Sequence, residues 1–219
     1  EITCRDWSSD VCSSDLQLGS GDMFIPLIWS KREEQSLGIQ AAFIRYDSDL
    51  KGGLTLLLTQ VAGGGVSEEL QADYLQRALT LAFAKGATGA FWYELQEPLV
   101  AGEAETLHFG LLRADGSRKP AYGAYQVMSK ALTGRHFIGA VELAKGVFGY
   151  NFATEDDLDV TSVLWTNGTP TEITVNVSGH QVDVLDERLR PREFYRQGDK
   201  LTFTANGKVT FLVSAKKVN

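Results

Sequence analysis

The stretch Leu54–Leu95, "LTLLLTQVAGGGVSEELQADYLQRALTLAFAKGATGAFWYEL", decides the fold that we predict for this chain. Leu54–Val61 is a short, nearly continuous apolar run, which is typical of a strand that is covered on both faces. Ala87–Leu95 is a second run of the same kind. A glycine-rich turn and a long segment of helical period separate the two runs, so the stretch indicates a strand, a helix and a strand.

The segment between the two predicted strands carries the signals of a helix. Ser67 is a favourable N-cap, and the two glutamates that follow it stand where the helix dipole favours negative charge. Gly86 is a natural stop. The apolar residues at helical spacing are Leu70, Tyr74, Leu75, Ala78, Leu79, Ala82 and Phe83. A strand, a helix and a strand in this order predict two parallel strands joined by a crossover helix.

The alternation of helix and strand extends outward on both sides. Lys31–Leu50 is predicted to be a helix, because Leu37, Ala41 and Ile44 recur at helical spacing and two glycines follow the segment. Pro120–Leu132 is predicted to be another helix, with Pro120 in its first turn. Residues 17–134 therefore belong to the α/β class.

The hydrophobic pattern changes after Gly134. Apolar and polar residues alternate in short segments at 147–152, 173–177, 182–184, 201–203 and 209–213, and the dipeptides Asn167-Gly168 and Asn206-Gly207 are turn signals. Short strands at this spacing predict that residues 135–219 form a small antiparallel β-sandwich. Because these strands have apolar faces of their own, we expect the sandwich to be stable by itself.

The first sixteen residues, "EITCRDWSSDVCSSDL", have neither helical nor strand period. Cys4 and Cys12 are the only cysteines of the chain, and no histidine lies near them to complete a metal site. The segment resembles the forward translation of a sequencing-library adapter, and we expect residues 1–16 to be artefactual. The other interpretation is a disordered, serine-rich natural terminus. We predict no metal and no cofactor for the chain.

The charge of the remaining chain argues against some partners. The formal net charge is −7, and residues 1–16 carry four acids and one arginine, which leaves −4. A mildly acidic chain is unsuited to a nucleic acid held by phosphate contacts, and no apolar run is long enough to span a membrane. Residues 17–219 contain no cysteine, which is compatible with a secreted or periplasmic bacterial location, which we favour, and with a cytoplasmic one. The oligomeric state is not predicted.

Several motifs resemble the end of a clan A glycoside hydrolase barrel. They are the two strands, their helices, "FWYEL" at 91–95 and "HFGLLRADGSRKPAYGAYQVM" at 108–128. The segments "VTSVLWTN" at 160–167 and "VDVLDERLRP" at 182–191 resemble the small β-domain that often follows such barrels. The resemblance implies that the chain holds the last two β/α units of an eight-unit TIM barrel followed by a β-sandwich. It also implies that the general acid/base carboxylate lies on an earlier strand, outside this sequence.

The position that matches the family's nucleophile is occupied by an amide. In the family a strand ends in Thr-Glu, and here Thr59 is followed by Gln60. A retaining glycosidase needs an ionised carboxylate to attack the anomeric carbon. Gln60 therefore indicates a homologue that has lost the reaction, an error in the sequence, or a different register. A buried glutamine that satisfies a neighbouring polar group is the structural alternative.

Three further residues are candidates for substrate binding. The resemblance implies that Trp92 faces a sugar ring at the strand end, although a core tryptophan is the alternative. Glu94 has the same strand parity as Trp92 and could bind sugar hydroxyls, or it could be a solvated acid. His108 either lines the pocket or packs the loop. Glu97, with the acids that follow it, is expected to form a solvated loop.

The sequence leaves three functions open. The first is a fragment of a glycoside hydrolase that cleaves O-glycosidic bonds of a poly- or oligosaccharide by a retaining two-carboxylate mechanism. We expect this chain, as it stands, to be inactive. The second is a carbohydrate-binding homologue without catalysis, and the third is a structural remnant with an accessory sandwich.

Overall fold

The computed structural model describes residues 23–26, 39–46, 54–61, 67–92, 95–97, 110–141, 143, 145–166, 169–177 and 181–215. Residues 1–16, Glu94, His108 and the Asn167-Gly168 dipeptide lie outside these ranges, so the predictions made for them stay predictions.

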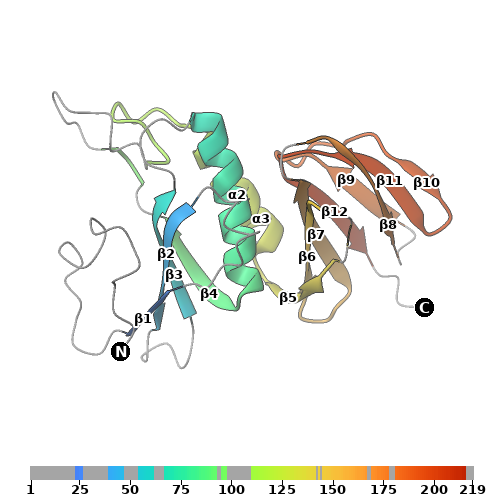
Figure 1. Ribbon diagram of the computed structural model, residues 1–219, viewed down its shortest axis with the longest axis horizontal. Coiled ribbons are helices and arrows are strands. Elements are labelled where there is room, and N and C mark those ends of the chain that lie inside the picture. Colours follow the sequence, from blue (N-terminus) through green and yellow to red (C-terminus); the bar gives the residue numbers. More distant parts are fainter. Residues whose placement is uncertain are drawn as a thin grey trace.

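The first sheet contains four strands in the order β1-β2-β3-β4 (Figure 1). They are β1 (Met23–Pro26), β2 (Ile39–Tyr46), β3 (Leu54–Val61) and β4 (Ala87–Trp92). The pair β3–β4 is parallel, as the sequence predicted, whereas β1–β2 and β2–β3 are antiparallel. Among the described strand pairs β3–β4 is the only parallel one.

The helix predicted for Lys31–Leu50 is wrong, because Ile39–Tyr46 forms strand β2. The helical spacing of Ala41 and Ile44 is shared by any short apolar run and does not by itself decide the type of element. β-Branched and aromatic residues such as Ile39 and Phe43 suit a pleated strand. Pairing with β1 on one side, over Phe43–Tyr46, and with β3 on the other then satisfies backbone groups on both edges of β2.

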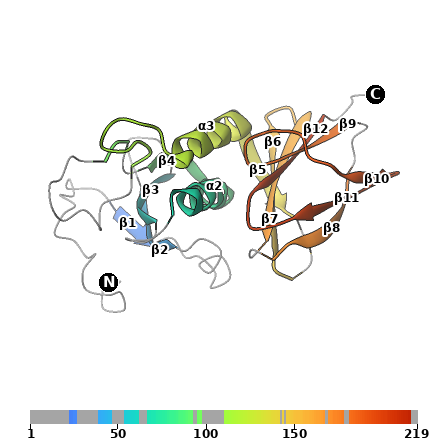
Figure 2. The same cartoon turned by 90° about the horizontal axis from the view of Figure 1, so that it is seen from above.

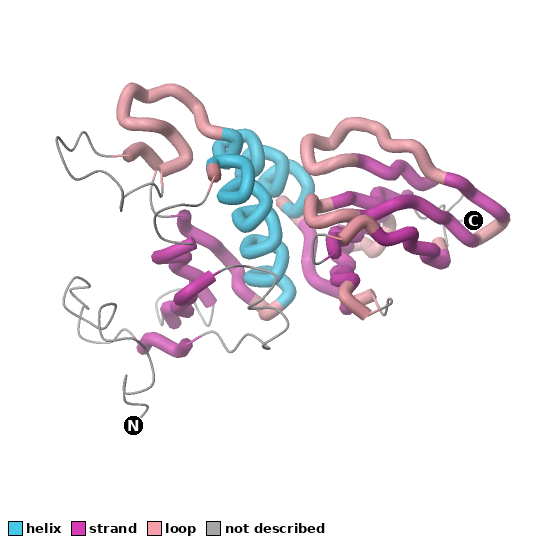
Figure 3. The backbone as a smooth tube through the Cα atoms, turned by 45° about the horizontal axis from the view of Figure 1, so that its top comes forward, coloured by secondary structure: helices cyan, strands magenta, loops and turns pink. Residues whose placement is uncertain are grey.

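The other two predicted helices are confirmed. Helix α2 (Glu68–Ala84) begins after Ser67, whose hydroxyl accepts a hydrogen bond from the Leu70 amide at 3.2 Å. The chain leaves α2 through Gly86, whose φ of 92° suits glycine. Helix α3 (Pro120–Leu132) has its proline in the first turn. The two helices lie side by side (Figures 2 and 3).

The C-terminal part contains two antiparallel sheets, with the strand orders β5-β6-β7-β12-β9 and β10-β11-β8. The strands are β5 (Arg135–Ala140), β6 (Val147–Thr154), β7 (Asp159–Thr166), β8 (Thr171–Asn176), β9 (Gln181–Leu185), β10 (Tyr195–Gln197), β11 (Lys200–Ala205) and β12 (Thr210–Ala215). The sheets share one hydrophobic cluster, to which Leu164 and Val184 contribute from one sheet and Ile173 and Phe203 from the other. The Asn206-Gly207 turn connects β11 to β12, which belong to different sheets.

A second hydrophobic cluster joins the helices to the five-stranded sheet. Leu75, Leu81 and Met128 of α2 and α3 pack in one cluster with Trp165 and Phe211. Trp165 is fully buried, and its ring stacks at 5.4 Å on the rings of both Phe148 and Tyr150. The helices thus lie between the first sheet and the five-stranded sheet (Figures 1 and 2). The outer face of the predicted sandwich is therefore covered by helices, which argues against its expected stability in isolation.

Candidate functional site

The candidate site lies where β3 and β4 end. Leu58 is the Cα partner of Trp92 in the parallel pair. Parallel neighbours present their C-terminal ends at the same edge of a sheet, so the backbones of Gln60 and Trp92 reach one edge. The structure describes the backbone of Gln60 but not its side chain, so the roles predicted for Gln60, Glu94 and His108 remain predictions.

The backbone around Gln60 departs from a regular ladder. Gln60 pairs with Ala41 of β2, and the register shifts on both sides of this pair, between Ile39 and Ala41 and between Ala41 and Phe43. Bulges of this kind are common next to active sites, where they redirect a side chain. The irregularity therefore falls at the residue that the resemblance places at the nucleophile position.

Trp92 is partly buried and packs against the cluster that contains the two helices. Ala90, which has the same strand parity, packs against the same cluster. Part of the Trp92 ring is therefore in contact with the core. This contact favours a structural role in the core for at least one side of the ring. Binding of a sugar ring by Trp92 stays a prediction.

The chain after β4 is fastened by a buried ion pair that the sequence did not indicate. Lys119 pairs with Glu97, and their side chains are only 2% and 9% exposed. The expectation that Glu97 belongs to a solvated loop is wrong, because its side chain is buried against Lys119. The sequence did not indicate this pair, since Lys119 lies far along the chain at the start of α3. The Leu112 amide donates to the Leu95 carbonyl at 2.8 Å, and the Glu97 amide donates to the Leu112 carbonyl at 3.1 Å.

A second ion pair fastens the turn before α3. Arg113 donates from Nε to Glu68 Oε1 at 2.8 Å and from Nη2 to Oε2 at 2.5 Å. The hydrogen bond to Glu68 raises the pKa of Arg113. Sequence reasoning placed Glu68 only at the helix N-terminus, and charged residues in a loop give no local signal of such a partner. The two ion pairs attach the chain after β4 to the first turns of α2 and α3.

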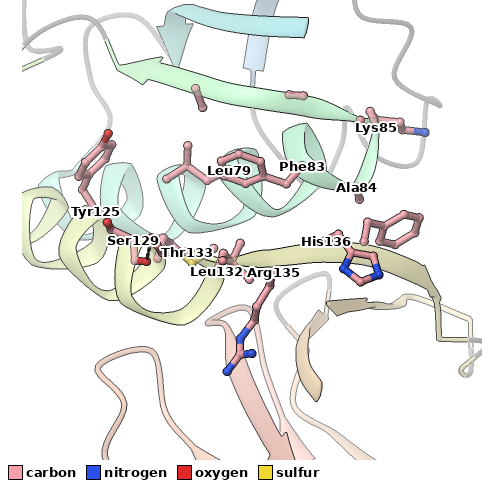
Figure 4. Close-up of a pocket in the computed structure, with 16 residues that line it drawn as sticks. Leu79, Phe83, Ala84, Lys85, Tyr125, Ser129, Leu132, Thr133, Arg135 and His136 are labelled. Atoms are coloured by element: carbon pink, nitrogen blue, oxygen red, sulfur yellow. Dashed lines mark hydrogen bonds between the residues drawn. The ribbon is translucent and has the colours of Figure 1, made fainter. Parts of the chain in front are cut away.

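A groove of about 840 Å³ lies at the opposite end of β4 from Trp92 (Figure 4). We call it the β4 groove. Leu79 and Phe83 of α2 point toward β4, and Tyr125 and Leu132 of α3 form another wall, whereas the Arg135 side chain points away from α2. Its lining is largely apolar and lies away from the candidate site, so we do not assign it to sugar binding.

A second groove, of about 610 Å³, lies between the two helices and two turns of the C-terminal sheets. We call it the interface groove. Its lining includes Asp73 and Gln76 of α2, Tyr122 and Gly123 of α3, and Glu187 and Lys208 of the turns. Unlike the β4 groove, it is rich in charged and polar side chains.

The described residues offer no obvious metal or membrane site. No group of three His, Cys, Asp or Glu side chains within them is arranged to hold a metal ion. Within the same residues no helix combines the length and apolar character needed to cross a bilayer.

Comparison with known proteins gives a likeness of fold. No protein-family model matches the chain, and no curated protein matches it. A family 39 glycoside hydrolase from the gut symbiont Bacteroides cellulosilyticus WH2 matches with a TM-score of 0.60 and 23% identity, over 68% of this chain and 31% of that one. The catalytic domain of GH30 xylanase C from Talaromyces cellulolyticus matches with a TM-score of 0.51 and 11% identity, over 70% of this chain and 37% of that one.

These structures show what the chain is similar to in fold. The chain spans about a third of the length of each of these two structures. Both are glycoside hydrolases, as the motifs at the strand ends implied, and the similarity covers a part of their fold.

Proposed function

We propose that this chain is the C-terminal part of a clan A glycoside hydrolase, with residues 17–134 as the last two β/α units of a TIM barrel and residues 135–219 as the appended β-sandwich. The observation that carries the proposal is the parallel pair β3–β4, joined by α2 and followed by α3, in a chain whose fold resembles a family 39 glycoside hydrolase. In such barrels the catalytic residues stand at the C-terminal ends of the strands.

The open side of β4 supports the assignment to part of a barrel. Among the described residues β4 is the end strand of its sheet and is paired on one side only, with β3. The β4 groove leaves Leu79, Tyr125 and Leu132 facing a hollow beside this strand. A further β/α unit would pair with β4 and fill this hollow, which is how a barrel removes its sheet edges.

The proposed chemistry is retaining hydrolysis of an O-glycosidic bond in a poly- or oligosaccharide. One carboxylate attacks the anomeric carbon while a second carboxyl group protonates the leaving oxygen, and water then releases the sugar from the enzyme. In this chain the nucleophile position holds Gln60, and the acid/base is assigned to an earlier strand. Trp92, Glu94 and His108 are proposed to contact the substrate. The proposal requires no metal and no cofactor.

The experiment is a comparison of full-length parent protein with Gln and with Glu at position 60, measured as turnover of a panel of aryl glycosides. Gln60→Glu should raise turnover by about 10⁴-fold or more, since loss of one essential catalytic group commonly costs that much. Equal turnover by both proteins would show that Gln60 is not at the nucleophile position, and Glu94 would be the next acid to test.

Gln60 also favours a second function, that of a carbohydrate-binding homologue without catalysis. An amide can hydrogen-bond to sugar hydroxyls but has no comparable nucleophilicity. In this case the full-length parent would bind oligosaccharides, and Gln60→Glu would leave it without hydrolytic activity. A saccharide ligand agrees with a secreted or periplasmic location, which we propose for the parent protein.

A further inference from the structure

We propose that the interface groove, whose described lining does not include Trp92, binds a neutral oligosaccharide at a second site. The choice of a saccharide rests on the proposed function, whereas the groove itself is a feature of the described residues. At about 610 Å³ it falls within the size range of small-molecule sites.

The walls of the groove come from separate parts of the chain and are held together by hydrogen bonds. Gln76 of α2 donates from Nε2 to the carbonyl of Glu187 at 2.8 Å, and Arg77 donates from Nη2 to the carbonyl of Gly207. Arg118, at the entrance to α3, lies over the Tyr122 ring at 4.7 Å from its centroid. The groove is therefore a preformed hollow whose helical wall is tied to the opposite wall of turns.

The charges of the lining balance, which argues for an uncharged ligand. The lining contains five cations and three acids, but Arg113 and Lys119 are paired with Glu68 and Glu97, which lie outside the lining. Three cations (Arg118, Arg188 and Lys208) and three acids (Glu69, Asp73 and Glu187) remain, and Glu187 already pairs with Arg188 at 3.8 Å and with Lys208 at 3.7 Å. Such a surface supplies hydrogen-bond donors and acceptors in similar number. A polyhydroxylated molecule can use both kinds at once, whereas an ion would be attracted by one set and repelled by the other.

Asp73 gives this surface a half-buried carboxyl group. Burial raises the pKa of Asp73, against the opposing effects of Lys208 and Arg77, while Glu187 and Glu69 also raise it. The ionised carboxylate is thus poorly solvated in the free protein. Sugar hydroxyls that donate to its oxygens would restore the hydrogen bonding that burial removes.

Gly123 leaves open space on the α3 wall of the groove. It is exposed in the first half of the helix, and a Cβ added there would meet no atom within 4 Å. Its φ is not in the left-handed region, so the backbone does not require glycine. Because glycine in a helix interior is about 0.5–1 kcal/mol less favourable than alanine, a glycine that packing does not explain is accounted for if a ligand occupies the space beside it.

The test is titration of the whole chain with neutral xylo-, cello-, manno- and malto-oligosaccharides, followed by calorimetry and by NMR of the amides that line the groove. Gly123→Phe places a ring in the groove, and Gly123→Ala is the matched control that leaves it open. We expect one saccharide series to bind the parent chain and Gly123→Ala equally. It should bind Gly123→Phe at least about tenfold more weakly, which corresponds to about 1.4 kcal/mol. Far-UV circular dichroism and thermal melting establish that Gly123→Phe is folded.

Further binding measurements distinguish a failure of the groove proposal from a failure of the proposed function. Trp92→Ala should leave the binding in the interface groove unchanged. If Trp92→Ala abolishes binding and Gly123→Phe does not, the saccharide site lies at the β3–β4 edge, which overturns the groove and upholds a carbohydrate function. Tighter binding of an acidic saccharide, weakened by salt, would overturn the neutral assignment. Absence of binding by any saccharide at millimolar concentration would overturn the groove proposal, while the glycoside turnover experiment would remain a separate test of the parent protein.

Discussion

Lys119, the residue that precedes helix α3, forms an almost completely buried ion pair with Glu97, which lies in the chain that leaves β4. The pair joins two segments whose contact determines how the loop after the candidate site returns to the helices. Removing one partner leaves the other charge buried without its counter-ion, which commonly costs about 3–5 kcal/mol.

We therefore expect Lys119→Met to lower the free energy of unfolding by roughly 3–5 kcal/mol, measured by urea denaturation. Glu97→Gln should be destabilising in the same way, and the double variant should recover part of the loss because no uncompensated charge remains. If each single variant unfolds at the same urea concentration as the parent chain, the pair does not hold this loop.

The contact between the helices and the five-stranded sheet leads to a prediction about a shorter chain. A protein made of residues 135–219 would lose the cover that α2 and α3 give to Trp165, Phe148 and Phe211. Trp165 is its single tryptophan, so fluorescence reports directly on that face. We expect emission at longer wavelength than from a buried indole, and strong binding of a hydrophobic dye. A blue-shifted Trp165 in this fragment would show that the two sheets fold without the helices.

The same contact predicts how the whole chain responds to one substitution. Trp165→Ala should destabilise the whole chain by roughly 3–5 kcal/mol, as expected for a large buried ring. Glu172→Ala, at an exposed position of β8, is a control that should change little. Loss of signal from the helices and from the sheets at the same denaturant concentration would confirm that they unfold together.

The sequence predicted those elements whose signals are local. Ser67, Gly86 and Pro120 mark helix boundaries that depend on neighbouring residues only, and the structure has them where they were predicted. Strand β2 was mistaken for a helix because its type depends on pairing with β1 and β3, which the sequence does not display. Glu97 was wrongly expected to be solvated because its burial depends on Lys119, a partner that is distant in the sequence.

Part of the candidate site could be predicted from the sequence, and the interface groove could not. Parallel pairing of β3 and β4 follows from their order with α2, so it could be predicted that the backbones of Gln60 and Trp92 reach the same edge of the sheet. The interface groove could not be predicted from the sequence, because Asp73, Tyr122 and Lys208 come together only when the helices pack on the turns of the C-terminal sheets. Charged side chains in a sequence look alike whether they are solvated or line a groove.

Two glycines should respond in opposite ways to the same substitution. A Cβ at Gly110 would lie 2.5 Å from the Leu112 carbonyl oxygen and 2.7 Å from the Glu97 amide nitrogen, whereas a Cβ at Gly123 meets nothing within 4 Å. We expect Gly110→Ala to destabilise the chain by about 1–3 kcal/mol through overpacking. Gly123→Ala should stabilise it by about 0.5–1 kcal/mol. Thermal melting of both variants measures these changes in stability. A stabilising Gly110→Ala would contradict the close approach of Gly110 to Leu112 and Glu97.

Asp73 should make the stability of the chain depend on pH. Burial raises the pKa of Asp73 above its usual value near 3.8, so the folded chain holds this proton more tightly than the unfolded chain does. Its contribution to stability is complete below pH 3.8 and is lost as the pH rises through the folded-state value. Asp73→Asn does not titrate, so its stability relative to the parent chain should increase as the pH is raised from 3.8 toward neutrality.

Asp156 provides a control of opposite sign in the same experiment. Hydrogen bonds from the Thr154 hydroxyl and the Leu158 amide lower its pKa. Its contribution is therefore present above pH 3.8 and is lost as the pH falls through the folded-state value. Urea denaturation from below pH 3.8 up to neutrality should show Asp156→Asn losing stability relative to the parent chain as the pH rises toward 3.8, and Asp73→Asn gaining stability as the pH rises above 3.8. If the Asp73→Asn difference is constant with pH, Asp73 is as well solvated in the folded chain as in the unfolded one, and the interface groove loses the carboxylate that was expected to need sugar hydroxyls.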